Sequence, residues 1–115
     1  MSTAASARRL LCGGQIEQLG GGLYLRPTVL ADVTPDMAVM TEETFGPVIP
    51  VTMFDTVEEA LTLANSGVFG LSGSVLAGTD GEAAAVARLL NVGAVSVNDG
   101  ALTSMVWDAE KSSFG

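Results

Sequence analysis

Two segments of the second half of the chain, 56–67 and 79–93, have apolar residues at the spacing i, i+3, i+4, i+7. This spacing places the apolar side chains in one stripe along a helix, so both segments are predicted to be amphipathic helices. The stripes consist of Val57, Ala60, Leu61 and Ala64 in the first helix, and of Ala83, Val86, Ala87 and Leu90 in the second.

Both predicted helices begin with a threonine that is followed three residues later by a glutamate. The pairs are Thr56 with Glu59 and Thr79 with Glu82. In such a capping box the threonine oxygen and the glutamate carboxylate each accept a hydrogen bond from a free backbone N–H of the first turn. Gly67 and Gly93 follow the two helices and are predicted to end them, Gly67 in a left-handed conformation.

Short apolar runs at 47–54, 71–77 and 94–98 alternate with these helices and predict strands. The order from residue 48 is therefore strand, helix, strand, helix, strand. Helices of about ten residues between short strands are the crossovers that parallel sheets require. The predicted fold class is α/β, with three layers and a mostly parallel sheet.

The first half of the chain is less regular. The Ala-rich segment 3–11 is predicted to be the tail of a helix, stopped by Gly13 and Gly14, and 13–22 a hairpin or loop. Segment 23–33 predicts a strand interrupted by Pro27, because proline cannot donate to a sheet ladder. The pair Thr34-Pro35 is typical of a turn or a helix start. From Asp99 onward the periodicity is lost, which predicts a loop.

Charge and composition exclude several classes of function. Thirteen acids against five bases give a net charge of −8, which repels nucleic acid and an anionic membrane surface alike. Hydrophobic residues make up 48% of the chain, so a folded chain of at most one domain, or a piece of a larger one, is expected. No segment approaches the about 20 apolar residues of a membrane span.

The chain contains no histidine and a single cysteine, Cys12. This excludes Ser-His and Cys-His catalysis and an internal disulfide, and it leaves too few ligands for a zinc site, so no metal is expected. The apolar part of the N-terminal segment, 10–12, is too short for a signal-peptide core. The predicted location is cytoplasmic.

The segment 41–54, TEETFGPVIPVTMF, is the strongest candidate for a binding site, because it combines two acids and an aromatic residue with a turn. The glycines at 20–22 and at 67, 70 and 73 do not have the spacing of a dinucleotide-binding loop. Glu43 stands beside the turn-forming pair Gly46-Pro47 and can accept hydrogen bonds from both hydroxyls of a ribose, while Phe45 can lie against a flat heterocycle. Alternatively, Glu42 and Glu43 are solvated acids and Phe45 is a core side chain.

Four blocks in the same order and spacing resemble the C-terminal part of the catalytic domain in the NAD(P)-dependent aldehyde dehydrogenase superfamily. The blocks are Pro27-Thr28-Val29-Leu30, Glu42-Glu43-Thr44-Phe45-Gly46-Pro47-Val48, ANSGVFGLSGSVLA at 64–77 and GAVSVN at 93–98. The resemblance runs from about Leu11 to Asn98. It identifies residues 1–115 as a C-terminal fragment of such a catalytic domain, without the dinucleotide-binding domain.

The resemblance implies a role for two residues. Glu43 matches the family glutamate that hydrogen-bonds the nicotinamide ribose of NAD or NADP, and Phe45 matches the aromatic residue beside the nicotinamide. In the family's reaction a cysteine thiolate attacks an aldehyde, a hydride passes to the nicotinamide, and water hydrolyses the thioester to a carboxylic acid. Correct placement of the nicotinamide therefore affects the rate of hydride transfer.

The chain departs from the family pattern at the nucleophile. The family cysteine lies well upstream of the Glu-Glu-x-Phe block and follows Gly-Gln, whereas Cys12 precedes Gly-Gly-Gln by one position and lies about thirty residues before Glu43. No catalytic residue is therefore assigned, and Cys12 is predicted to be a non-catalytic thiol. The tail departs as well, with Glu110-Lys111-Ser112-Ser113 in place of the family's glycine-rich loop, and Met105 and Trp107 fit a substrate entry or a loop anchor.

Two hypotheses follow for the isolated chain. In the first it is part of an aldehyde-oxidising enzyme, inactive alone and with weak or no binding of NAD or NADP, and its expected partners are a complementary upstream fragment or further copies in a homo-oligomer. In the second it is a non-catalytic α/β interaction module that docks onto a full-length relative or a complementary half. A self-contained small α/β domain of unrelated function is a third alternative.

Overall fold

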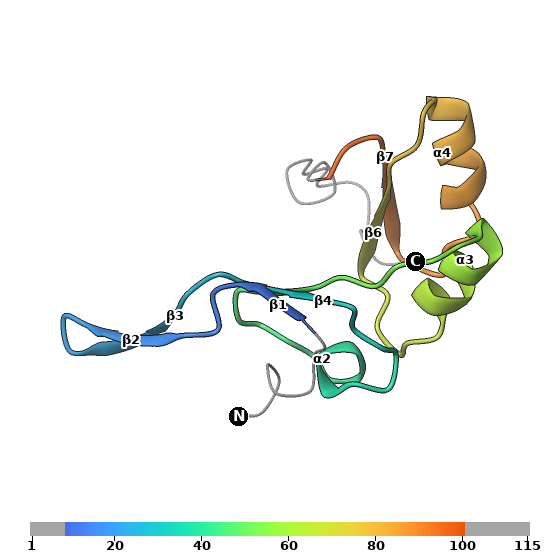
Figure 1. Ribbon diagram of the computed structural model, residues 1–115. Coiled ribbons are helices and arrows are strands. Elements are labelled where there is room, and N and C mark those ends of the chain that lie inside the picture. Colours follow the sequence, from blue (N-terminus) through green and yellow to red (C-terminus); the bar gives the residue numbers. More distant parts are fainter. Residues whose placement is uncertain (1–8, 101–115) are drawn as a thin grey trace. The chain divides into compact units, whose positions relative to one another are not determined.

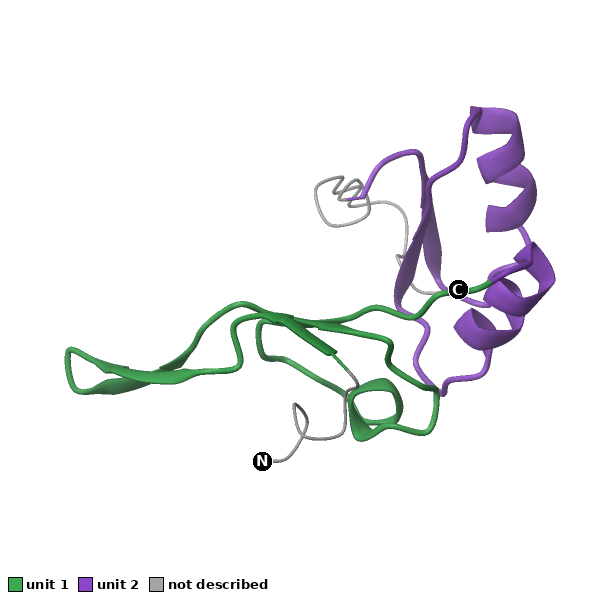
Figure 2. Cartoon of the chain, viewed as in Figure 1, with its two compact units in different colours: residues 1–54 green, residues 55–115 purple. Residues whose placement is uncertain are grey.

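In the computed structural model, residues 9–100 are described, and the chain divides into two compact units, 1–54 and 55–115 (Figure 2). The first unit contains β1 (Arg9–Cys12), β2 (Ile16–Leu19), β3 (Gly22–Leu25), β4 (Thr28–Ala31), α2 (Ala38–Thr41) and β5 (Val48–Pro50). The second contains α3 (Val57–Asn65), β6 (Ser72–Val75), α4 (Asp80–Ala87) and β7 (Ala94–Val97) (Figure 1). The α/β class is confirmed, as is the predicted order of strands and helices from residue 48.

The main sheet of the first unit has the strand order β1-β4-β5. The pair β4–β5 is parallel, while β1 pairs with β4 in the antiparallel direction. The prediction of a helix over 3–11 is wrong for Arg9–Cys12, which forms β1. Pairing of Leu10 with Leu30 across the strands outweighs the weak helical preference of this segment, because local propensity yields to tertiary contacts.

A small core lies beside this sheet. Leu30, Val33 and Val39 are buried, and Met37 and Val48 pack against them. Leu30 is fully buried at the centre of β4. The core thus joins β4, the short helix α2 and β5, which are the elements on both sides of the segment 42–47.

A separate two-stranded hairpin, β2–β3, is inserted between β1 and β4 (Figure 1). Gly20 and Gly21 form its two-residue loop, and both have positive φ, of 56° and 85°. Two consecutive residues with positive φ are typical of the tight turn whose twist matches the strands of a hairpin. The hairpin alternative predicted for 13–22 is therefore confirmed, and Pro27 separates β3 from β4 as predicted.

In the second unit, β6 and β7 form a parallel pair connected through α4. Ala83 and Ala87 of the predicted stripe are buried, and Thr79 and Glu82 form the complete capping box. In α3 the Thr56 oxygen accepts the hydrogen bond from Glu59 N, but the Glu59 carboxylate accepts from Asp55 N at 2.9 Å instead of Thr56 N. The predicted capping box of α3 is therefore only half formed.

Gly67 follows the end of α3 as predicted, but its predicted left-handed conformation is wrong, as is the predicted end of the second helix at Gly93. Among the described residues, the glycines with positive φ are Gly13, Gly14, Gly20 and Gly21, so Gly67 does not adopt the left-handed conformation. Helix α3 ends with Ser66 in the right-handed region, where its hydroxyl donates to Leu63 O at 2.7 Å. Helix α4 ends at Ala87, six residues before Gly93. A serine hydroxyl thus satisfies a terminal carbonyl that the pattern assigned to glycine.

The side chain of Asn65 joins the end of α3 to the segment that follows α4. Its Nδ2 donates to Leu89 O at 2.9 Å, and its Oδ1 accepts from Asn91 N at 2.8 Å. Replacing Asn65 by alanine is expected to lower the free energy of unfolding by about 1–2 kcal/mol, because both bonds are lost at a partly exposed position. Chemical denaturation followed by circular dichroism measures this change.

Thr62→Ala in the same helix is the matched control, because the Thr62 hydroxyl donates only to Glu58 O within α3. We expect it to change the free energy of unfolding by less than about 0.5 kcal/mol. Equal effects of the two substitutions would contradict a connecting role for Asn65.

Candidate functional site

The segment 42–47 is held at both of its ends by the core of the first unit. On one side, α2 is anchored by the buried Val39, and Glu42 N donates to Ala38 O at 2.8 Å. On the other side, Val48 packs on the core, and Thr28 N donates to Pro47 O at 2.8 Å. The turn itself is closed by the bond from Val48 N to Gly46 O at 2.8 Å. The loop is therefore short and fixed at two points.

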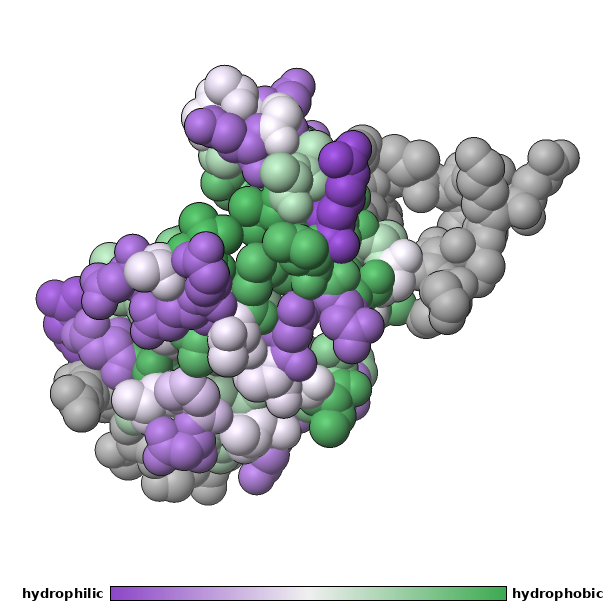
Figure 3. All heavy atoms as spheres, turned by 90° about the vertical axis from the view of Figure 1, so that its right-hand side faces the viewer, coloured by the Kyte–Doolittle hydropathy of each residue, from purple (hydrophilic) through white to green (hydrophobic). Residues whose placement is uncertain are grey.

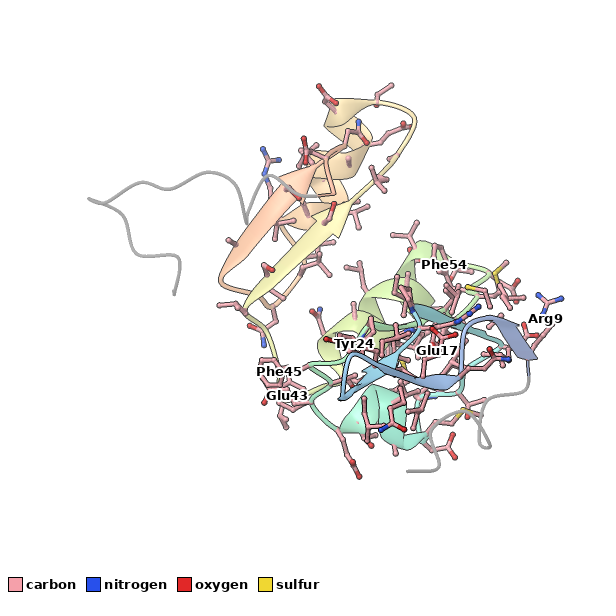
Figure 4. All side chains as sticks on the ribbon, turned by 90° about the vertical axis from the view of Figure 1, so that its left-hand side faces the viewer. Arg9, Glu17, Tyr24, Glu43, Phe45 and Phe54 are labelled. Atoms are coloured by element: carbon pink, nitrogen blue, oxygen red, sulfur yellow. The ribbon has the colours of Figure 1, made fainter. Side chains whose placement is uncertain are left out.

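Glu43 and Phe45 lie between these anchors and are presented to solvent (Figure 4). Phe45 is 92% exposed. The interpretation of Phe45 as a core side chain is therefore wrong for the described part of the chain, while Glu42 and Glu43 are exposed acids. A carboxylate and an aromatic ring are thus two residues apart on an anchored loop. Both side chains are therefore accessible to a ligand.

Sequence reasoning did not find the residues that hold this loop. Val39 lies in the apolar run 37–40 and Val48 begins the apolar pair 48–49, and these runs on both sides of the loop were the available signal. Thr28 belongs to the Pro27–Leu30 block that resembles the family, but no pattern in the chain pointed to a role for its hydroxyl. Its buried hydroxyl donates to Arg26 O at 2.7 Å and accepts from Gly14 N at 2.8 Å, which fixes the start of β4.

One carboxyl group near α2 has a shifted pKa. The Thr34 hydroxyl donates to Asp36 Oδ1 at 2.6 Å, and this hydrogen bond holds the pKa of Asp36 below its ordinary value. Asp36 is fully exposed and precedes α2, so it stabilises the turn ahead of the helix and takes no part in the loop 42–47.

The other residues considered for a functional role lie apart from the loop 42–47 or outside the described residues. Cys12 is exposed at the end of β1, and its sulfur is 3.9 Å from Pro27 O. Within residues 9–100 no three Cys, Asp or Glu side chains are grouped as metal ligands, and no helix is long and apolar enough to cross a membrane. Met105, Trp107 and the segment 110–113 lie outside the described residues.

The anchored loop 42–47, with its acidic and aromatic side chains, thus lies in an α/β scaffold immediately before the parallel strand β5. The family model that matches this chain is that of the aldehyde dehydrogenase family, over residues 2–115. The chain belongs to the aldehyde dehydrogenase family.

Two curated relatives show the extent of the match. The chain is 43% identical over 101 residues to the mitochondrial succinate-semialdehyde dehydrogenase of Rattus norvegicus, covering 88% of this chain and 19% of the relative. It is 44% identical over 96 residues to the succinate semialdehyde dehydrogenase [NAD(P)+] Sad of Escherichia coli, covering 84% and 21%. The chain therefore spans about a fifth of the length of these relatives.

Solved structures of aldehyde dehydrogenases also match this chain. A structure described as an aldehyde dehydrogenase, PutA, from Anabaena variabilis has a TM-score of 0.86 and 50% identity, over 93% of this chain and 24% of that one. The aldehyde dehydrogenase of Mycobacterium tuberculosis complexed with NAD+ has a TM-score of 0.73 and 38% identity, over 78% and 19%.

Proposed function

We propose that this chain contributes the nicotinamide-ribose contact of an enzyme that oxidises an aldehyde to a carboxylic acid with NAD or NADP. Glu43 accepts hydrogen bonds from the two ribose hydroxyls, and Phe45 packs beside the nicotinamide. The observation that carries the proposal is the two-point anchoring of the loop 42–47 by Val39 and Val48, with both functional side chains left exposed. Anchoring at both ends reduces the freedom that a ligand would have to remove on binding.

The chemistry assigned to Glu43 is positioning. A carboxylate that receives hydrogen bonds from two neighbouring hydroxyls fixes the sugar, and the sugar fixes the ring that accepts the hydride. NAD or NADP supplies the hydride acceptor when bound. The family match and the NAD+ complex of the M. tuberculosis relative support a dinucleotide cofactor for the intact enzyme.

The nucleophile and the remaining walls of the cofactor site are assigned to residues outside this sequence. The chain has no histidine, and Cys12 lies in β1 with its sulfur facing a backbone carbonyl. We therefore expect the isolated chain to bind NAD or NADP weakly or not at all and to produce no reduced cofactor from a panel of aldehydes. Isothermal titration and the absorbance of reduced cofactor measure the two quantities, and clear turnover by the chain alone would contradict this assignment.

Mixing tests the proposal directly. The E. coli relative shortened by the segment that this chain matches is combined with the full chain, and turnover of succinate semialdehyde is measured. Restored turnover is expected to fall about ten- to a hundredfold with Glu43→Gln, the equivalent of one lost charge-assisted contact. Glu42→Gln is the matched control, since Glu42 is an adjacent exposed acid without an assigned contact, and it is expected to leave turnover unchanged.

The second hypothesis, a non-catalytic interaction module, is favoured by the apolar side chains that the chain leaves uncovered on the face drawn in Figure 3. It predicts binding to the shortened relative without restored turnover. Equal effects of Glu43→Gln and Glu42→Gln on a restored activity would overturn the assigned role of Glu43.

A further inference from the structure

The β2–β3 hairpin exposes apolar side chains on both of its faces. Within residues 9–100 its two strands pair only with each other, and they form a sheet of their own that projects away from β1, β4 and β5 (Figure 1). Leu23 is 77% exposed and Tyr24 57%, and Ile16 and Leu19 are exposed to a similar extent. A two-stranded hairpin without further packing is marginally stable in water. The hairpin therefore gains stability from any partner that extends its sheet.

The hydrogen-bonding pattern of the hairpin identifies which backbone groups are free to pair. Arg26 N donates to Gln15 O at 3.1 Å, so residues 15 and 26 form a hydrogen-bonded pair. Hydrogen-bonded and non-hydrogen-bonded pairs alternate along an antiparallel ladder. The pair Glu17–Tyr24 is therefore also hydrogen-bonded, and the backbone N–H and C=O groups of Tyr24 point towards Glu17. On β3 the N–H and C=O groups of Leu23 and Leu25 consequently point outward, away from β2.

This free edge of β3 is complementary to its own copy. Two β3 strands related by a two-fold axis at Tyr24 place Leu23 of each copy opposite Leu25 of the other, in hydrogen-bonded pairs. Tyr24 then faces Tyr24 of the second copy in a close, non-hydrogen-bonded pair. The new cross-strand contacts are therefore leucine with leucine on one face and tyrosine with tyrosine on the other, and such pairs stabilise a sheet.

The charges favour the β3 edge over the β2 edge. Two copies of a chain with a net charge of −8 repel each other over most of their surface. The strand β3 contains no acid, and the one acid of the hairpin, Glu17, is paired with Arg26, whose Nε is 2.8 Å from Glu17 Oε1. The equivalent pairing of two β2 strands about Glu17 would place two carboxylates opposite each other, which destabilises a sheet.

We propose that this chain forms a two-fold dimer in which the β3 edges of two copies pair in the antiparallel direction about Tyr24. The hairpins then form one four-stranded sheet with the order β2-β3-β3-β2. This inference depends on the geometry of the hairpin alone, and its test requires no cofactor or turnover, so it stands or fails independently of the proposed function.

Cross-linking tests the register. In a Cys12→Ser background, Tyr24→Cys is expected to give a disulfide-linked dimer under mild oxidation. The Cα atoms of a non-hydrogen-bonded pair are about 4.5 Å apart, within the range of a disulfide. Glu17→Cys is the matched control, because Glu17 is directly opposite Tyr24 on the other strand of the same hairpin. Non-reducing electrophoresis is expected to show the dimer for Tyr24→Cys only, and equal cross-linking of both variants would overturn the register.

Charge exchange tests the interface without a covalent bond. Tyr24→Lys and Tyr24→Glu each place like charges opposite each other and are expected to weaken dimerisation about tenfold or more, as measured by sedimentation velocity. An equimolar mixture is expected to restore the dimer, because the two charges are then opposite in sign. Restoration on mixing excludes misfolding as the cause of the loss in the single variants.

Leu76→Lys is the control for general charge effects, because Leu76 is as exposed as Leu23 but belongs to the second unit. It is expected to leave the dimer unchanged. A native chain that remains monomeric at every concentration measured would overturn the proposal, as would a Tyr24→Lys variant that dimerises as well as the native chain. The first of these results would assign the hairpin to a different polypeptide.

Discussion

Replacing Gly13 by alanine is expected to lower the free energy of unfolding by about 3 kcal/mol or more, the larger of the two strongest effects predicted for this chain. Gly13 has a φ of 77°, which costs a residue with a Cβ about 1–2 kcal/mol. The added Cβ would also lie 2.2 Å from Pro27 O and 2.6 Å from Thr28 Oγ1. Because the first of these is a backbone atom of the residue that immediately precedes β4, the clash is relieved only by moving the backbone at the start of the strand.

Gly20→Ala separates the cost of the positive φ from the cost of the clash. Gly20 has a φ of 56°, but no atom lies within 4 Å of the Cβ that would be added there. The control therefore retains the conformational cost and lacks the clash, and about 1–2 kcal/mol is expected. Chemical denaturation at a single protein concentration measures both variants, since association changes the apparent stability. An effect of Gly13→Ala no larger than that of Gly20→Ala would contradict the role of the contact with Pro27.

Replacing Leu30 by alanine is expected to lower the free energy of unfolding by about 3 kcal/mol. Leu30 is fully buried in β4, and removal of its side chain leaves a cavity between α2 and β5 in addition to the lost apolar burial. Val39 and Val48 then lose the surface that holds both ends of the loop 42–47. We therefore expect the same variant to reduce any turnover restored by mixing.

Leu11→Ala is the matched control for Leu30→Ala, because Leu11 belongs to the paired strand β1 but is 55% exposed. A change of about 0.5 kcal/mol is expected for this exposed leucine. If the two variants unfold at the same denaturant concentration, the assignment of Leu30 as the centre of the core is wrong.

The predicted effects share one physical cause, which is the small size of the core. The first unit buries Leu30, Val33 and Val39 as its connected apolar core, and α3 buries no residue. With so few buried side chains, each one and each backbone contact at β4 accounts for a large part of the stability. The same shortage leaves Leu23, Tyr24 and Phe45 exposed and available to a partner.

Local patterns were sufficient for helix α4 and the strands beside it. The stripe at Ala83 and Ala87 and the Thr79–Glu82 capping box lie within one helix, so the interactions that form them are near in sequence. The same holds for the parallel pair β6–β7, because neighbouring parallel strands are usually connected through a helix such as α4. The resemblance of segment 41–54 to the aldehyde dehydrogenase family was likewise visible in consecutive residues, and the family match confirms it. The roles of Glu43 and Phe45 and the cytoplasmic location stay predictions.

Residue patterns alone therefore determined the α/β class, the helix starts and the family, since each depends on neighbours within about a turn or a strand. The tertiary structure decided that Arg9–Cys12 is a strand, that Gly67 is not a left-handed cap and that Val39 and Val48 anchor the loop 42–47. These features depend on contacts between residues distant in sequence, such as Leu10 with Leu30 and Gly14 with Thr28. Such contacts leave no periodicity in the chain, because their energy appears only after the strands have met.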